Sequence, residues 1–190
     1  GTLTAGDIVS TTTLAVTGAT TFTGGVVGNV KARGLSTVPI TGATLSTYGT
    51  DAASASGTAV YLAPVFVPAN CTVTGIACLN GTTVGTDNLV YYLFNNAGTM
   101  VAKTAAAGTL SAGSDVFQEI ALTAPYSAVG PANYWIGWQA NGTTAAHQTV
   151  AASTFKLLGG TVAGSSFGVE TSVVVPTTFT ADTAPIAYLY

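Results

Sequence analysis

Short runs of apolar and β-branched residues, interrupted by Gly, Pro and Asn every few positions, restrict the fold of this chain more than any other feature of its sequence. Lys, Glu, Gln and Met, which favour helices, are scarce, and residues 105–107 form the only helix-like run. Parallel strands need long crossovers, whereas antiparallel strands can be joined by turns. The sequence therefore predicts an all-β fold, an antiparallel β-sandwich of the jelly-roll type.

The expected strands follow from these runs and from the turn residues between them. They cover residues 58–67, 71–79, 88–94, 99–103, 116–122, 133–139, 148–158, 167–175 and 186–190. Asn and Gly in residues 95–98 mark a hairpin turn, because both accept a positive φ. The Gly-rich stretch 158–166 is expected to be a loop.

The first fifty residues have a different sequence pattern from the rest of the chain, and this pattern predicts a second structural unit. The phrase Val-Thr-Gly-Ala-Thr at 16–20 returns as Ile-Thr-Gly-Ala-Thr at 40–44. Such short strand-turn units carry too few apolar side chains to enclose a core, so residues 1–50 are expected to become ordered as a stalk intertwined with its copies. The alternative is a flexible Thr/Gly linker. Small polar residues at 46–57 join this segment to a sandwich head at 58–190.

Charged residues are rare: the chain has four basic and seven acidic side chains. Soluble domains normally carry about a quarter charged residues, which limit association with neighbours. A surface of Thr, Ala, Gly and Ser predicts burial against other subunits. Four basic residues cannot neutralise a nucleic-acid backbone or hold an anionic lipid surface, and no apolar run is long enough to cross a membrane.

The polar residues with catalytic potential are dispersed along the sequence. The closest acidic pair, Asp115 and Glu119, does not form a convincing acid-base pair, because Asp115 is expected in a loop. His147 is the only histidine, so any Ser-His-Asp triad would have to use it, and we expect it in a loop. The sequence predicts that the protein is not an enzyme.

Metal and cofactor sites are not predicted either. Cys71 and Cys78 are seven residues apart along one expected strand, which places them on opposite faces and disfavours a disulfide. Two cysteines and one histidine without a recognised spacing do not predict a zinc site. A calcium ion held by loop oxygens would leave no signature in the sequence and stays open.

One aromatic cluster is a candidate for ligand binding or for a subunit contact. In the strand expected at 133–139, Tyr134 and Trp138 share one face, and Trp135 lies on the other. An exposed aromatic face could stack on a sugar or meet another subunit, whereas a buried one fills the core. Core packing is the preferred interpretation.

Several phrases resemble bacteriophage proteins. Residues 14–22 and 40–44 resemble the repeated N-terminal stems of phage fibre and head-decoration proteins, and the segment from residue 60 resembles their small jelly-roll modules. The phrases in that segment are residues 63–68, 72–76, 93–98 and 134–139. The resemblance implies a homotrimer on the surface of the virion, assembled in the host cytoplasm, without enzyme activity.

The function predicted from these features is a trimeric decoration protein of a phage capsid. Its expected partners are its own copies and the major capsid protein or another virion protein. The residues predicted to anchor it are Leu3, Ile8, Leu14, Val16 and Phe22. The alternative is the receptor-binding tip of a tail fibre, in which the aromatic face around Trp135 and Trp138 binds a host glycan.

Overall fold

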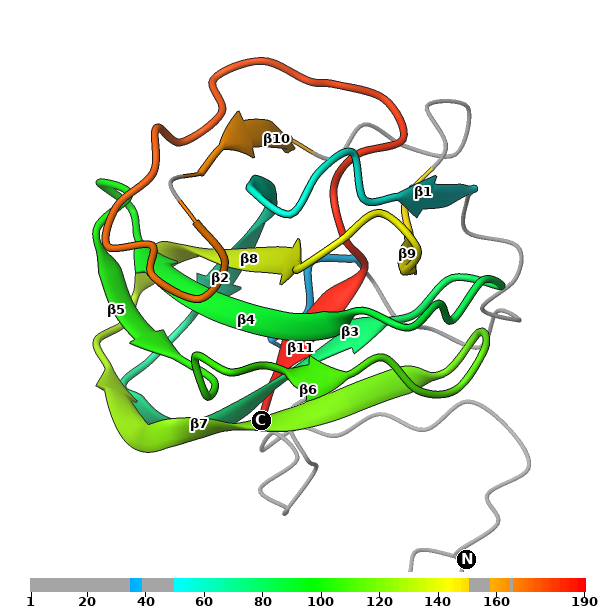
Figure 1. Cartoon of the computed structure of the whole chain (residues 1–190). Coiled ribbons are helices and arrows are strands. Elements are labelled where there is room, and N and C mark those ends of the chain that lie inside the picture. Colours follow the sequence, from blue (N-terminus) through cyan, green and yellow to red (C-terminus); the bar gives the residue numbers. More distant parts are fainter. Residues whose placement is uncertain (1–34, 39–49, 151–157, 165) are drawn as a thin grey trace, which may run out of the picture.

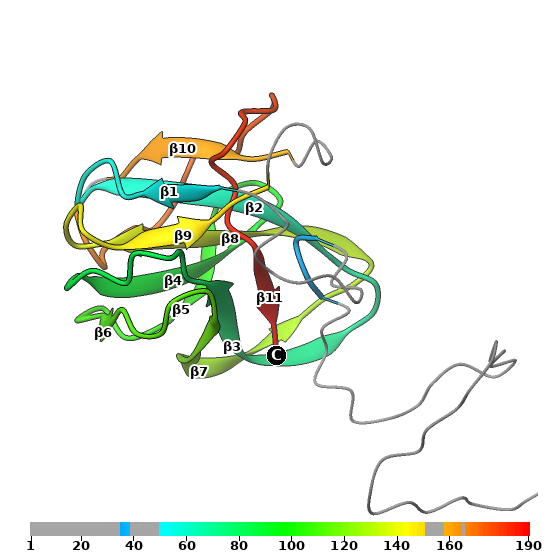
Figure 2. The same cartoon turned by 90° about the vertical axis from the view of Figure 1, so that its right-hand side faces the viewer.

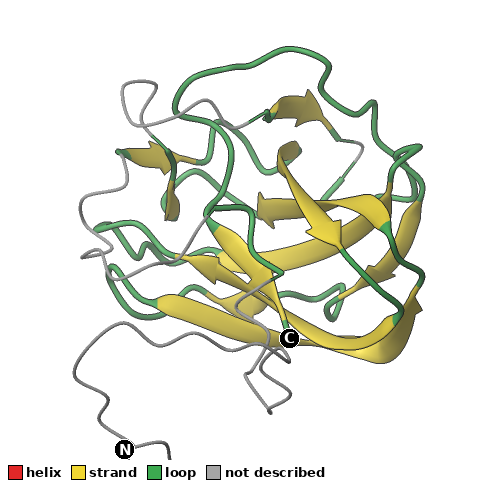
Figure 3. Cartoon of the chain, turned by 180° about the vertical axis from the view of Figure 1, so that it is seen from behind, coloured by secondary structure: helices red, strands yellow, loops and turns green. Residues whose placement is uncertain are grey.

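A computed structural model describes residues 35–38, 50–150, 158–164 and 166–190. These residues contain strands and loops but no helix (Figure 3). The strands are β1 (Asp51–Ala53), β2 (Ala59–Val67), β3 (Cys71–Leu79), β4 (Asn88–Asn95), β5 (Met100–Lys103), β6 (Thr109–Leu110), β7 (Phe117–Ala128), β8 (Ala132–Ala140), β9 (Ala146–Gln148), β10 (Gly160–Ala163) and β11 (Ala187–Leu189). The predicted all-β class is confirmed.

The strands form three sheets in which every pairing is antiparallel. The largest has the order β10-β2-β8-β4-β5, with β6 also paired to β4. A second sheet has the order β11-β3-β7, and β1 pairs with β9. Figure 2 shows β11 of the three-stranded sheet running across the direction of β4 and β10 of the larger sheet.

The main hydrophobic core lies between the six-stranded and three-stranded sheets. Val65, Leu93 and Trp138 from the larger sheet share one cluster with Ile76 and Leu189 from the smaller one. In β4 and β8, alternate residues point to this core, which is the arrangement that pleated strands impose. The two sheets therefore enclose one core in a sandwich-like manner.

The outer face of the six-stranded sheet is also buried. Val90, Tyr92 and Phe94 of β4 form a second cluster there, and Phe167 and Val175 pack against it. This explains why β4 carries apolar side chains on both of its faces, whereas strands with one solvated face alternate apolar and polar residues. A third layer of chain therefore covers the sheet.

Two predictions for this part of the chain are wrong. Residues 167–175, predicted as a strand, begin with a turn at Phe167 and Gly168 and contain only an isolated bridge, from Ser172 to Thr99. In Figure 1 this orange segment passes beside β4 and β5, where Val173 N–H donates to Gly98 O at 2.8 Å. Conversely, β10 lies in the stretch 158–166 predicted as a loop, because its main chain pairs with the edge of β2. Of the strand predicted at 148–158, Gln148 ends β9 and residues 151–157 lie outside the described residues.

The prediction that Cys71 and Cys78 lie on opposite faces of one strand is also wrong. Cys78 is buried in the main core, and half-buried Cys71 packs against the same cluster, so the two do not occupy opposite faces. The cause is an irregularity of the β3–β7 ladder: Val73 pairs with Tyr126, but Gly75 pairs with Ala121. Such a bulge exchanges the faces of the residues beyond it. Both thiols are free, as expected, and burial raises the pKa of Cys78 well above its usual range.

Residues 35–38, which belong to the segment predicted as the stalk, pack onto the sandwich. Ser36 forms a bridge with Tyr188, and Leu189 N–H donates to Leu35 O at 3.0 Å. Leu35 and Val38 are buried, at 9% and 2% exposure. This piece therefore extends the three-stranded sheet beyond β11. The predicted joining segment 46–57 also contains β1.

Candidate functional site

The residues predicted to anchor the protein lie outside the described residues. They are Leu3, Ile8, Leu14, Val16 and Phe22. The prediction that residues 1–50 form an intertwined stalk falls largely on the same part of the chain, and only 35–38 and Thr50 of that segment are described.

The three aromatic residues named as ligand candidates are all part of the protein interior. Tyr134 and Trp135 are each 4% exposed, and Trp138 is fully buried. Tyr134 and Trp138 face the main core, and Trp135 faces the outer cluster, as the alternation of β8 predicts. The Tyr134 hydroxyl donates to Val129 O and accepts from Val129 N–H. These two hydrogen bonds stabilise the turn between β7 and β8. Their placement matches the preferred interpretation of core packing.

His147 lies in β9 and not in a loop, which corrects the prediction. Its ring is fully buried, with ring centroids 4.7 Å from Tyr61 and 4.5 Å from Trp138. Nε2 lies 3.0 Å from Thr183 O, so this nitrogen carries the proton and donates it, and Nδ1 has no partner among the described residues. Burial lowers the pKa of His147 to about 4, against smaller opposing effects of Thr183 and Asp51. The imidazole is therefore neutral at physiological pH.

One serine motif was missed by the sequence analysis. Gly164, Ser166 and Gly168 match the Gly-x-Ser-x-Gly pattern of hydrolase nucleophiles. The hydrolase motif requires a following helix and a nearby histidine, but this segment continues into the covering layer without a helix. Ser166 O accepts a hydrogen bond from Gln139 on the outer face of β8, whereas His147 contacts Trp138 on the inner face. The sheet thus separates the serine from the histidine.

The acidic residues are distributed among separate partners. Asp115 and Glu119, the closest acidic pair in the sequence, have different partners: Asp115 accepts from Gln148, and Glu119 accepts from the Tyr188 hydroxyl. Instead, the fold brings Asp115 close to Asp51 of β1. Gln148 Nε2 lies 2.8 Å from Asp51 Oδ1 and 2.9 Å from Asp115 Oδ1. No sequence spacing signals this approach, because it depends on β1 pairing with β9.

Asp87 has a structural role. Its carboxylate accepts the N–H groups of Thr144 and Ala145 at 2.7 and 2.8 Å. Burial raises the pKa of Asp87, but these hydrogen bonds outweigh burial and hold the pKa below its usual value. The ionised carboxylate therefore fixes the turn before β9.

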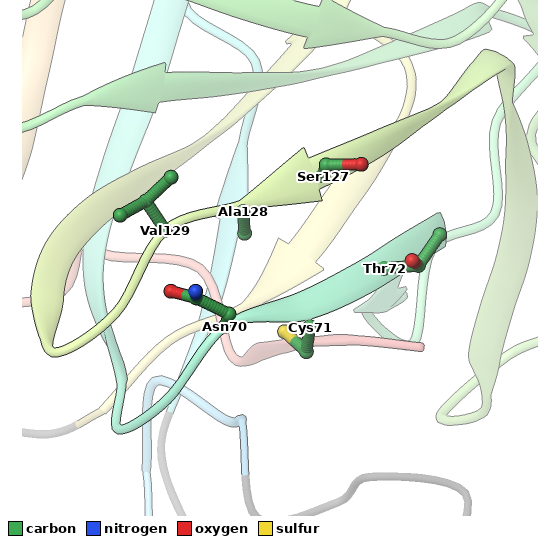
Figure 4. A pocket seen from close by; sticks show the side chains of 6 residues that line it. All are labelled: Asn70, Cys71, Thr72, Ser127, Ala128 and Val129. Carbon is green, nitrogen blue, oxygen red and sulfur yellow. The ribbon is translucent and has the colours of Figure 1, made fainter.

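Two open hollows occur on the described surface. The first, of about 260 Å³, lies where the start of β3 meets the end of β7, between Cys71 and Val129 (Figure 4). Its lining contains a thiol, hydroxyls and an amide but no acid, base or aromatic ring. The second, of about 370 Å³, lies between β10 and residues 174–180 and is lined by Thr and Val. Neither hollow assembles groups for catalysis.

The described surface is neutral and carries exposed apolar side chains. Its large exposed apolar residues are Phe66, Leu110, Val116, Val129, Leu158, Val169 and Val174, and Val174 is 83% exposed. Two of the described acidic residues, Asp87 and Glu170, are buried, and Lys103 is the one described basic residue. Lys103 Nζ donates to Gly168 O at 2.6 Å. The described surface therefore carries few charges that could repel a neighbouring molecule.

Two further properties concern the described residues only. They contain no group of three or more His, Cys, Asp or Glu side chains placed to hold a metal ion. They also contain no helix that is long and apolar enough to span a membrane.

The described residues thus define an all-β protein of antiparallel sheets with a neutral surface. Comparisons of the chain with protein-family models, with curated proteins and with solved structures gave no match. The functional argument therefore rests on the physical properties of this chain.

Proposed function

We propose that this protein is a structural component of a bacteriophage virion, a homotrimer that decorates the capsid. The proposed molecule has a jelly-roll head and an N-terminal stalk or anchor within residues 1–50. The observation that carries the proposal is the neutral, partly apolar surface of the head, on which few charges oppose close contact with neighbours. The Thr/Gly phrases that resemble phage stems supply the reason for placing it on a virion.

The proposed role is mechanical. A capsid presents the same site many times, so weak contacts from each subunit of a trimer add up through avidity. Exposed Thr, Ala and Val side chains lose little conformational freedom when they are covered, which favours such contacts. No catalytic step is part of this role.

A truncation tests the proposal. A protein that lacks residues 1–34 keeps Leu35 and Val38 in the core, so we expect it to fold and to melt like the full chain. Because the anchor is removed, we expect it to lose binding to particles that were stripped of this protein, measured by co-sedimentation. Undiminished binding of the truncated protein would contradict the role of the anchor.

Substitutions provide a matched control. We expect Leu14→Asn, Val16→Asn and Phe22→Asn in one variant to weaken particle binding at least tenfold, because three apolar contacts are lost. The control carries Thr13→Asn, Thr17→Asn and Thr21→Asn in the same stretch and should bind like the wild type. Equal loss in both variants would indicate that the apolar side chains are not the anchor.

The second hypothesis, a receptor-binding tip that holds a host glycan, has less support. Stacking on a sugar needs an exposed aromatic face, and Tyr134, Trp135 and Trp138 are buried. A glycan would have to bind elsewhere on the head, and neither hollow is lined by an aromatic ring. Capsid decoration is therefore the function that we propose.

A further inference from the structure

Two turns that connect the sheets form one end of the head, and this end carries exposed apolar side chains. The turns lie between β2 and β3 and between β7 and β8. Phe66 is 53% exposed and Val129 is 64% exposed, and Pro68, Ala69 and Pro131 beside them are exposed as well. We propose that this end of the head, the turn end, packs against the turn ends of other copies of the chain.

The two turns of the turn end are packed closely together. Gly130 N–H donates to Asn70 Oδ1 at 2.9 Å, and Figure 4 shows Asn70 and Val129 lining the same hollow. A Cβ atom at Gly130 would lie 2.6 Å from Ala69 N and 2.7 Å from Val67 O, so only glycine permits this approach. The main chain next to Val129 thus touches the main chain next to Phe66. Such a fixed surface loses little conformational entropy when it is covered.

A further exposed apolar residue lies along the same end of the larger sheet. Val174 is 83% exposed, and the residue before it donates a main-chain hydrogen bond to Gly98 in the β4–β5 turn. That turn follows Asn95, which pairs with Tyr134 near the beginning of β8. The apolar surface therefore reaches from the turn end towards the covering layer.

The turn end is uncharged, whereas acidic residues lie at the opposite end of the head. Neither of its two turns contains a charged residue. Asp51 accepts from Thr82 N–H just after β3. Asp115 N–H donates to Gly81 O at the same place, and Asp87 directly precedes β4. Carboxylates are costly to cover without partners, so the acidic end suits water and the turn end suits contact.

The direction of the segment 35–38 supplies an independent indication. This segment is antiparallel to β11, and β11 is antiparallel to β3. It therefore runs parallel to β3, which starts at Cys71 in the turn end. Leu35 lies opposite Leu189, which pairs with Ile76, so the segment has its N-terminal side towards that start. Residues 1–34 consequently join the head from the side of the turn end.

A second copy is the partner that these observations favour. The contact depends on the proposed trimer, in which residues 1–34 of the copies are intertwined. Because these residues join each head from the side of the turn end, their association would bring the turn ends together. An uncharged apolar surface can meet its own copies without placing like charges opposite each other, and its burial releases water.

Charge placed at either end tests the contact in the full chain. For Phe66→Glu with Val129→Glu, we expect the trimer dissociation constant to rise at least about tenfold in sedimentation equilibrium, because apolar contacts are replaced by like charges. The control, Leu110→Glu with Val116→Glu, adds the same charge at the opposite end, where these side chains are 57% and 48% exposed. It should dissociate like the wild type. Circular dichroism of each variant shows whether it is folded.

Cross-linking provides a second measurement that does not depend on the glutamate variants. In a Cys71→Ser background, a short bismaleimide should join Ala69→Cys between copies, because this exposed position belongs to the turn end. Thr143→Cys is exposed at the opposite end and should stay unlinked. Cys78 is buried in the core and does not compete. A denaturing gel measures the linked fraction.

The proposal is overturned if the wild type is a monomer, if both glutamate variants dissociate equally, or if Thr143→Cys is cross-linked as well as Ala69→Cys. Particle binding distinguishes this failure from failure of the proposed function. A chain that binds stripped particles without a contact between turn ends would leave capsid binding in place. A trimer joined at its turn ends that does not bind particles would contradict capsid decoration alone.

Discussion

Individual residues respond to burial in ways that their type alone does not predict, and His147 is the clearest case. Its position between Tyr61 and Trp138 could not be read from the sequence, because the small residues Ala145 and Ala146 before it suit a loop equally well. The aromatic alternation of β8, by contrast, followed from strand geometry alone. Faces can be predicted within a regular strand such as β8, but bulges and partners across strands cannot.

The buried histidine predicts an acid-sensitive stability. Its folded pKa of about 4 lies below the unfolded value near 6.5, so between these values the unfolded chain binds a proton that the folded chain rejects. The full stability is therefore present above about pH 6.5, and about 3 kcal/mol is lost as the pH falls to about 4. Urea unfolding at a series of pH values measures this loss.

Two variants assign that loss to the imidazole. In His147→Phe, which keeps an aromatic ring, the free energy of unfolding should be nearly constant between about pH 6.5 and 4. Asp87→Asn should keep the histidine-dependent loss, because the carboxyl of Asp87, with its lowered pKa, contributes stability that is lost only at lower pH. Parallel curves for the wild type and His147→Phe would rule out His147 as the source.

At the scale of elements, the strands were predictable where turn residues bounded an apolar run, as for β3 and β8. The prediction was wrong where tertiary packing decided the outcome. Residues 167–175 are apolar enough for a strand, but they cover the outer face of β4, and their pairing with residues 98–100 is limited to one isolated bridge and does not continue as a ladder. The bulge between β3 and β7 likewise depends on pairing, so the shared face of the two cysteines could not be predicted.

The segment 35–38 predicts where the head begins. Thr37 N–H donates to Ala187 O at 2.9 Å, and its hydroxyl accepts from Ala187 N–H at 3.0 Å. With Leu35 and Val38 buried as well, removal of residues 1–49 should lower the free energy of unfolding by about 4 kcal/mol relative to removal of residues 1–34. Chemical denaturation of the two shortened proteins measures the difference. Equal stability would place residues 35–38 outside the folding unit.

At the scale of the whole molecule, the shortage of charge has its main consequence in association. The described surface leaves Phe66, Val129 and Val174 exposed, with few charges to oppose contact. Because the net charge is only -3, association is not strongly opposed at neutral pH. The trimer stays a prediction at this scale.

Added charge tests that prediction. We expect sedimentation of the wild type to give three times the monomer mass. A variant with Phe66→Glu, Val129→Glu and Val174→Glu should shift towards the monomer, because like charges replace apolar contacts. Its circular dichroism should be unchanged. The control carries Ala106→Glu, Ala121→Glu and Thr143→Glu, also exposed positions, and has the same net charge. It should remain a trimer, and equal dissociation of both variants would contradict an apolar interface.

The sequence by itself determined the all-β class, the antiparallel pairing and the alternation of faces within regular strands, because these depend on local propensity and on the spacing of turns. Only the tertiary structure decided which faces are covered, that His147 is buried, and that Asp51 and Asp115 meet across Gln148. These outcomes depend on contacts between residues far apart in the chain, and such contacts are fixed by the packing of whole sheets.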